Sequence, residues 1–125
     1  MLIQQERIRL PKEPTKENNF IISHITVPDH LSGLRIKLLA ETSLLDCVLI
    51  YDPTYQLRGE ITESQGLDML VIHEEEVLSS SSAKAGEIPA GEWLIAFELI
   101  DQKRDRTWEF SYQVEGMKAD AMANR

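Results

Sequence analysis

Apolar and polar side chains alternate one by one through much of this chain, whereas the spacing of an amphipathic helix is hard to find. The clearest stretch is 108–115, in which the apolar positions are Trp108, Phe110, Tyr112 and Val114. Because successive side chains of a strand point to opposite faces, this stretch predicts a strand with one buried and one solvated face.

Other parts of the chain predict further strands. Alternating segments lie at 34–41 and 93–99, an apolar segment lies at 67–73, and a weaker candidate for an edge strand lies at 3–10. The short polar stretch 101–105 leads from the strand at 93–99 to the one that starts at Trp108, so we expect these two strands to form a hairpin.

Two more segments, 20–27 and 45–51, are apolar on both faces for part of their length. That pattern is typical of strands in the middle of a packed sheet, because both of their faces are covered. Proline, glycine and polar residues at 28–33, 52–55 and 79–91 mark the turns and loops between the predicted strands.

These elements predict an all-β fold: an antiparallel β-sandwich of jelly-roll or galactose-binding-like type with seven to nine strands. We expect one sandwich domain over 1–116. Within it, 11–17 is a charged connector that cannot pair as a central strand. The remaining residues, 117–125, are expected to form a C-terminal tail or linker stub.

The composition fits one folded domain, since the chain has 125 residues, of which 42% are hydrophobic and 27% charged. Its net charge of −8 opposes binding to nucleic acid and to an anionic membrane surface, because both are negatively charged. The chain has no apolar run long enough for a membrane span or a secretion signal, so we expect a cytoplasmic protein.

Residues suited to metal binding or catalysis are few. Cys47 is the only cysteine, which excludes an internal disulfide, and its apolar neighbours favour a core position. The histidines His24, His30 and His73 follow no ligand spacing, and the chain has no glycine-rich phosphate loop. We therefore expect no cofactor. The alternative is a small metal-dependent hydrolase that uses His24, His73 and distant carboxylates.

The polar clusters and the aromatic residues favour ordinary structural positions. Residues 79–82 are all serine and lie in no nucleophile motif, which favours a loop. Trp93 and Trp108 fall on apolar strand faces, which favours core burial over a sugar-binding platform, whereas Tyr55 is the aromatic that we expect to be exposed. The following carboxylates form no calcium-loop motif and favour a solvated acidic face: Asp46, Asp52, Glu60, Glu63, Asp68 and Glu74 to Glu76.

Three short motifs of this sequence occur in the same order as motifs of a known family. They are Val27-Pro28 before a turn, Asp52-Pro53 followed by Arg58-Gly59, and the loop AGEIPAGEW at 85–93. Together they make 20–114 resemble the N-terminal β-sandwich domain of some metallohydrolases of the polymerase-and-histidinol-phosphatase superfamily. Backbone chemistry gives Pro53, Gly59 and Gly91 scaffold roles: a turn corner for Pro53, a bulge or a close backbone approach for Gly59, and a loop reversal for Gly91.

The resemblance implies a binding or interaction module without catalytic residues of its own. In that family a metal-binding domain follows the sandwich, and this sequence has no matching segment, so hydrolase activity does not carry over. We expect an accessory to a metal-dependent phosphohydrolase, with a metallohydrolase chain or a carbohydrate-like ligand as the partner.

A ligand held by such a module would meet polar residues around the second turn. The candidates are Asp52, Tyr55, Arg58 and Glu60. A third hypothesis is a self-associating structural subunit, because an unpaired edge strand can form a homodimer by extending a sheet.

Overall fold

The computed structural model describes residues 1–10, 20–39, 45–62, 68–99 and 108–118. Within these ranges the chain forms eight strands and one short 3-10 helix, η3 (Glu76–Leu78), so the predicted all-β class is confirmed. The strands are β1 (Leu2–Leu10), β2 (Phe20–Val27), β3 (Leu31–Leu39), β4 (Leu45–Tyr51), β5 (Leu57–Thr62), β6 (Met69–His73), β7 (Gly91–Leu99) and β8 (Trp108–Lys118).

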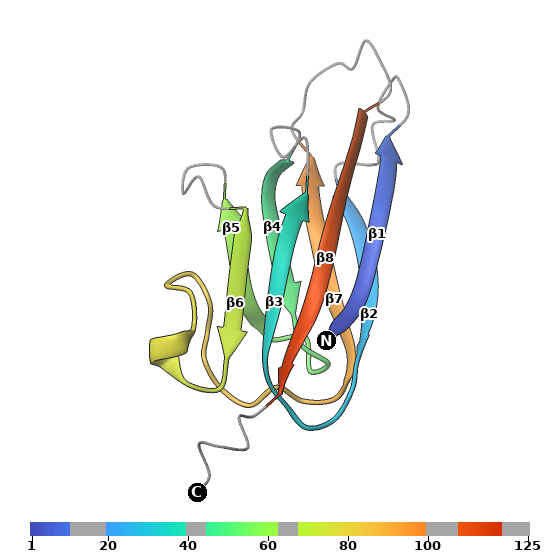
Figure 1. Cartoon of the computed structure of the whole chain (residues 1–125). Coiled ribbons are helices and arrows are strands. Elements are labelled where there is room, and N and C mark those ends of the chain that lie inside the picture. The colour runs from blue at the N-terminus through green and yellow to red at the C-terminus, as the bar shows by residue number, and fades with distance from the viewer. Residues whose placement is uncertain (11–19, 40–44, 63–67, 100–107, 119–125) are drawn as a thin grey trace, which may run out of the picture.

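The strands form two antiparallel four-stranded sheets that pack face to face (Figure 1). Sheet A has the order β1-β8-β3-β6, and sheet B has the order β2-β7-β4-β5. Apart from β4 and β5, which are neighbours in sheet B, each strand is followed in the chain by a strand of the other sheet. This is the eight-stranded jelly-roll arrangement, one of the two sandwich types that the sequence predicted.

The predicted hairpin between 93–99 and the last strand is wrong, because β7 lies in sheet B and β8 in sheet A. Their apolar faces meet across the core instead. The ring of Phe97 lies 5.0 Å from that of Phe110 and 5.1 Å from that of Tyr112, centroid to centroid. Alternation shows that a strand has a buried face, but it does not show which strand lies beside it. The stretch 101–105 is outside the described residues.

The strand positions correct two further predictions. β2 was expected in the middle of a sheet but lies at the edge of sheet B, whereas β4 is central and β1 is at an edge, as predicted. β8 continues to Lys118, beyond the expected domain end at 116. The connector 11–17 and residues 119–125 lie outside the described ranges.

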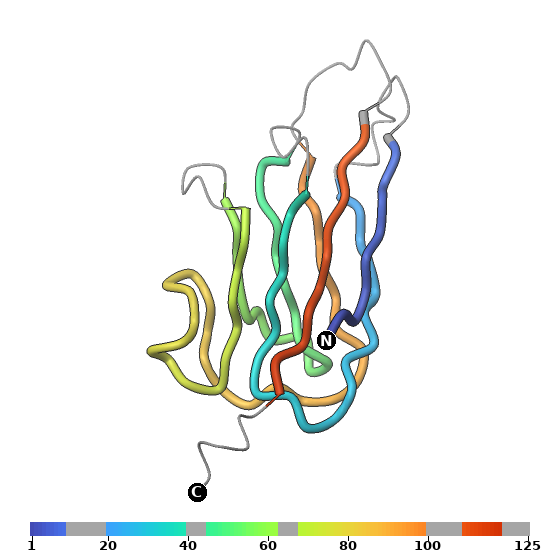
Figure 2. Tube along the Cα trace, in the orientation of Figure 1, coloured from blue at the N-terminus to red at the C-terminus, as the bar shows by residue number. Residues whose placement is uncertain are grey.

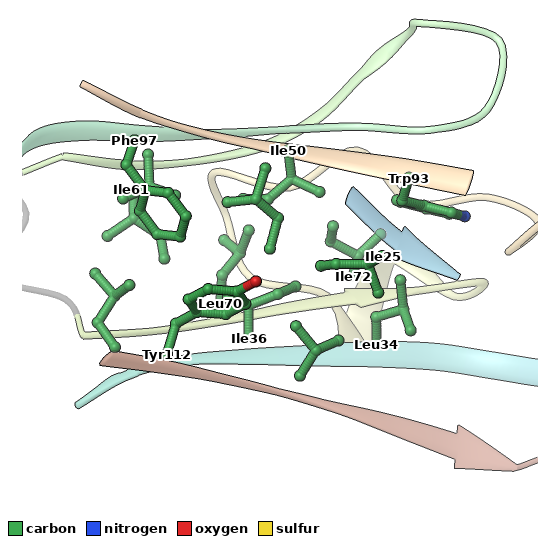
Figure 3. Close-up of a cluster of buried hydrophobic side chains, with 14 of the residues drawn as sticks. Ile25, Leu34, Ile36, Ile50, Ile61, Leu70, Ile72, Trp93, Phe97 and Tyr112 are labelled. Carbon is green, nitrogen blue, oxygen red and sulfur yellow. The ribbon is translucent and has the colours of Figure 1, made fainter. Parts of the chain in front are cut away.

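The core fills the space between the two sheets. Its largest fully buried side chains are Trp93, Tyr112, Phe97 and Phe110. Figure 3 shows Phe97 and Ile50 pointing from sheet B toward Tyr112 and Ile36 of sheet A. The predicted burial of Trp93 is confirmed, while the side chain of Trp108 is outside the description. Burial also raises the pKa of Tyr112, whose hydroxyl accepts a hydrogen bond of 2.6 Å from Gln4 Nε2.

Candidate functional site

The turn after β4 is built around the carboxylate of Asp52. Its Oδ1 accepts hydrogen bonds from the Thr54 N–H at 2.8 Å, the Thr54 hydroxyl at 2.6 Å and the Gln56 N–H at 3.1 Å. Such a side chain can replace backbone partners within a tight turn. Tyr55, at the tip, has a φ of 64° and a side chain that is 76% exposed, as predicted for this aromatic.

A β-bulge turns the next functional candidate, Arg58, into the interior. In the pairing of β4 with β5, Ile50 lies opposite Gly59 and Tyr51 lies opposite Leu57, so Arg58 is the extra residue. Both Arg58 and Gly59 are buried as a result. A side chain at position 59 would overlap Leu70 of the opposite sheet, which explains the glycine there.

The guanidinium of Arg58 fastens the loop before β7 to β5. It donates hydrogen bonds to the backbone carbonyls of Lys84 at 3.2 Å, Gly86 at 3.1 Å and Glu87 at 2.9 Å. Its Cζ also lies 5.4 Å from the ring centroid of Trp93, within range of a cation–π contact.

Arg58 and Asp52 complete an internal ion pair, with Nη1 3.6 Å from Oδ2 and each side chain only 5% exposed. Burial acts to raise the pKa of Asp52. Hydrogen bonds from Thr54 and Gln56, together with the charge of Arg58, outweigh burial and hold the pKa below its usual value of 3.8. Asp52 is therefore ionised at neutral pH and bound within the chain, and its predicted place on a solvated acidic face is wrong.

The four predicted ligand residues do not form one surface patch. Asp52 and Arg58 meet each other in the interior, while Tyr55 is exposed in the turn and Glu60 is half-buried on β5. The polar atoms of Asp52 and Arg58 are engaged by the chain itself. A role in ligand binding stays a prediction, and the geometry favours it only for Tyr55 and Glu60.

The motifs behind the family resemblance come together around this ion pair. Gly91 has a φ of 131°, and a Cβ there would lie 3.1 Å from Pro53 Cγ. Trp93 Nε1 donates a hydrogen bond of 2.9 Å to the carbonyl of Pro89. The scaffold roles expected for Pro53, Gly59 and Gly91 agree with this geometry.

The histidines lie apart. His24 on β2 and His73 on β6 occupy different sheets, so the structure does not assemble the metal site of the hydrolase alternative. His24 Nδ1 is 2.9 Å from Glu92 Oε1 at the surface, His73 Nδ1 accepts a hydrogen bond from the Glu75 N–H, and His30 is exposed in a turn. Among the residues that the structure describes, no three His, Cys, Asp or Glu side chains form a group that could hold a metal ion.

Cys47 was expected in the core, but it is half-buried on the outer face of sheet B. Its Sγ donates a hydrogen bond of 2.9 Å to Glu98 Oε2. Burial, the bond to Glu98 and the charges of Glu98, Asp46 and Glu60 raise the pKa of Cys47 to about 12. The thiol is therefore protonated at neutral pH and is a poor nucleophile.

The outer face of sheet B carries an apolar patch. Ile22, Ala96 and Leu49 lie side by side in one row across three strands. Leu94 and Tyr51 lie side by side in the next row. We call these five residues, together with Phe20, the sheet B patch. Phe20 and Ile22 are 51% and 57% exposed.

On the outer face of sheet A, arginine–glutamate ion pairs link neighbouring strands. Arg7 pairs with Glu109 at 2.9 Å, and Arg35 pairs with Glu115 at 3.1 Å. A face that serves only to meet water is normally polar in an antiparallel sandwich, so exposure to water does not explain the sheet B patch. The apolar signal was visible at 20–27 and 45–51, but there it predicted central strands.

No protein-family model and no curated protein matches this chain. The resemblance to the accessory domain of metallohydrolases rests on the sequence motifs and stays a prediction. None of the helices in the described ranges is long and apolar enough to cross a membrane.

Proposed function

We propose that this chain is a non-catalytic interaction module that binds a protein partner through the sheet B patch. The observation that carries the proposal is the exposure of Phe20 and Ile22 on the same face as the half-buried Leu49 and Leu94. Contiguous apolar surface of this kind marks interaction sites, and a few side chains, aromatic ones prominent among them, supply most of the binding energy there.

The charges around the patch indicate which partner surface would be complementary to it. Glu60 lies opposite Leu49 in the pairing with β5, Glu98 lies opposite Phe20, and Glu92 borders the patch beyond His24. With a net charge of −8, the chain favours a partner whose apolar centre is rimmed by lysine or arginine.

The family resemblance supports a metal-dependent phosphohydrolase chain as this partner. The carbohydrate-like ligand has less support, because Trp93 is 1% exposed and cannot stack on a sugar. The outer face of a sheet also suits a protein surface better than a small ligand, because small ligands bind in concave sites.

Site-specific photo-crosslinking tests the proposal. Benzoylphenylalanine is placed at position 22, inside the patch, or at position 113, on the outer face of sheet A as a matched control, and the chain is expressed in its native cells. We expect position 22 to give one defined adduct with another protein and position 113 to give none. Absence of an adduct at position 22, or the same adducts at both positions, would contradict the module.

Mass spectrometry of that adduct tests the identity of the partner. A metal-dependent phosphohydrolase is the expected protein. Identification of a different protein would support the interaction module but contradict a metal-dependent phosphohydrolase as its partner.

A further inference from the structure

We propose that the free edge of β2 pairs antiparallel with β2 of a second copy of this chain. The two B sheets then become one eight-stranded sheet whose outer face joins both sheet B patches. This inference builds on the proposed function, because it describes how the binding surface is enlarged. It rests on a comparison of the four sheet edges.

The edges formed by β5 and β6 are covered by the loop that follows η3 (Figure 2). This loop makes backbone and side-chain hydrogen bonds to both strands: Glu60 N–H to Ser82 O, Lys84 N–H to Arg58 O, Val71 N–H to Ser80 Oγ, Ser80 N–H to Val71 O and His73 N–H to Ser79 Oγ. An edge whose backbone groups are already paired offers few of them to another strand. The polyserine segment at 79–82, predicted as a loop, thus closes this side of the sandwich.

The β1 edge is protected in another way. Its register with β8 shifts between Leu2 and Gln4, and Arg7 and Arg9 lie along the strand beside Glu109. Bulges and charged side chains are two of the features by which proteins prevent edge strands from pairing with other chains.

β2 has neither protection. It pairs with β7 in an unbroken register from Phe20 opposite Glu98 to Val27 opposite Gly91. Its sequence, FIISHITV, contains no proline, lysine, arginine, aspartate or glutamate. Within the described part of the chain, β7 is its one strand partner. A regular, apolar and unpaired edge is a template for a further strand.

The strand is also complementary to itself. Antiparallel pairing about a twofold axis presents the same surface on both copies, and the core-facing side chains must stay aligned. An axis at Ile22 places Ile22 opposite its own copy and Phe20 opposite His24. An axis at Ser23 places Ile22 opposite His24 and Phe20 opposite Thr26. Either register brings Phe20 and Ile22 to the seam between the two copies, and their side chains stay on the outer face of the joined sheet.

The charges of the β2 side chains permit pairing at this edge, where the neighbouring carboxylate of Glu6 on β1 accepts a hydrogen bond from Ser23. Two chains of charge −8 repel each other, and the repulsion is smallest where no carboxylates meet. The β2 strand carries no acidic side chain, so paired β2 strands place no like charges directly opposite each other.

The expected dimer is weak. Five to seven residues pair in these registers, about 16 to 23 Å of strand, and pairing of one strand buries less than the roughly 1,200 Å² of a stable interface. We therefore expect a dissociation constant on the order of 10 to 100 μM. The middle of each patch, at Leu49 and Leu94, stays free for the partner protein.

Sedimentation velocity on the full chain, from low micromolar to near-millimolar concentration, tests the inference. The wild type should pass from monomer to dimer. Ile22→Lys should weaken dimerisation at least tenfold, whereas Gln5→Lys on the β1 edge, the matched control, should leave it unchanged. Hydrogen exchange of the β2 amides should slow as the wild-type concentration rises.

A second variant separates edge pairing from stacking of two patches. Leu49→Ser, in the middle of the patch, should preserve the dimer and weaken the adduct that forms through position 22 with the partner protein. Loss of the dimer in Leu49→Ser would overturn edge pairing, as would a wild type that is monomeric throughout. A monomer that still gives the adduct with another protein would reject this inference alone and keep the proposed function.

Discussion

Arg58 Nη1 lies 3.6 Å from Asp52 Oδ2 in the interior, and the two residues enter it from opposite ends of one turn. The turn holds the carboxylate through Thr54 and Gln56, and the bulge in β5 aims the guanidinium at the loop before β7. A buried ion pair is stable only when its remaining hydrogen-bonding atoms are satisfied, and here backbone groups satisfy most of them.

Removing the guanidinium should therefore be costly. We expect Arg58→Ala to lower the free energy of unfolding by about 3 to 5 kcal/mol, because it leaves a buried carboxylate and three loop carbonyls without their partner. Urea unfolding measures the change. Arg7→Ala is the control, since Arg7 pairs with Glu109 at the surface and should cost less than about 1 kcal/mol. Equal losses in the two variants would refute the structural role of Arg58.

The Asp52 carboxylate should make stability depend on pH in the acid range. Its pKa is lower in the folded chain than its usual value of 3.8, so its contribution is present above that value. The contribution is lost as pH falls through 3.8 toward the lower pKa of the folded state. The gap in free energy of unfolding between wild type and Asp52→Asn should therefore narrow on acidification, measured by urea unfolding at several pH values.

Thr54→Val provides an internal check on this pH dependence. It removes the hydroxyl donor to Asp52, which should bring the pKa of the carboxylate closer to its usual value. The pH dependence of stability should then be weaker than in the wild type. An unchanged dependence would mean that the hydrogen bonds of the turn do not set this pKa.

The Cys47 thiol should be slow to react in the folded protein. Its pKa of about 12, against the usual 9.0, lowers the thiolate fraction strongly. A more basic thiolate is a better nucleophile, which offsets part of this loss. We therefore expect alkylation on the order of a hundredfold slower than in the urea-unfolded chain at mildly alkaline pH. Glu98→Gln should speed the reaction, since it removes a neighbouring charge. A folded chain that reacts as fast as the unfolded one would contradict the geometry around this thiol.

The contact between Gly59 and Leu70 can be tested by a double-mutant cycle. Gly59→Ala should destabilise the fold by about 1 to 3 kcal/mol, because the added methyl group overlaps the Leu70 side chain. Leu70→Ala alone should cost about 2 to 5 kcal/mol, since Leu70 is fully buried. The double variant should cost less than the sum, because the smaller side chain makes room for the methyl group. Simple additivity in urea unfolding would show that the two positions do not touch.

The scaffold around Arg58 was only partly visible in the sequence. Pro53, Gly59 and Gly91 are residue types with restricted or unusual backbone conformations, so their structural roles could be predicted locally. The burial of Asp52 could not be predicted, because it depends on a bulge that turns Arg58 inward and on a loop more than twenty residues further along the chain. The sheet B patch was detected as two apolar segments, but it was assigned to the middle of a sheet.

The sequence by itself determined seven of the eight described strands, with β5 missed, and also the sandwich, the buried faces of the alternating strands and the exposure of Tyr55. Side-chain direction in a strand is a local property with a period of two, so it can be read from neighbouring residues. Only the tertiary structure decided that β7 and β8 face each other across the core, that β2 lies at an edge of sheet B, and that Asp52 meets Arg58 in the interior. Those relationships come from contacts between distant parts of the chain, and the alternation of residues is compatible with more than one such pairing.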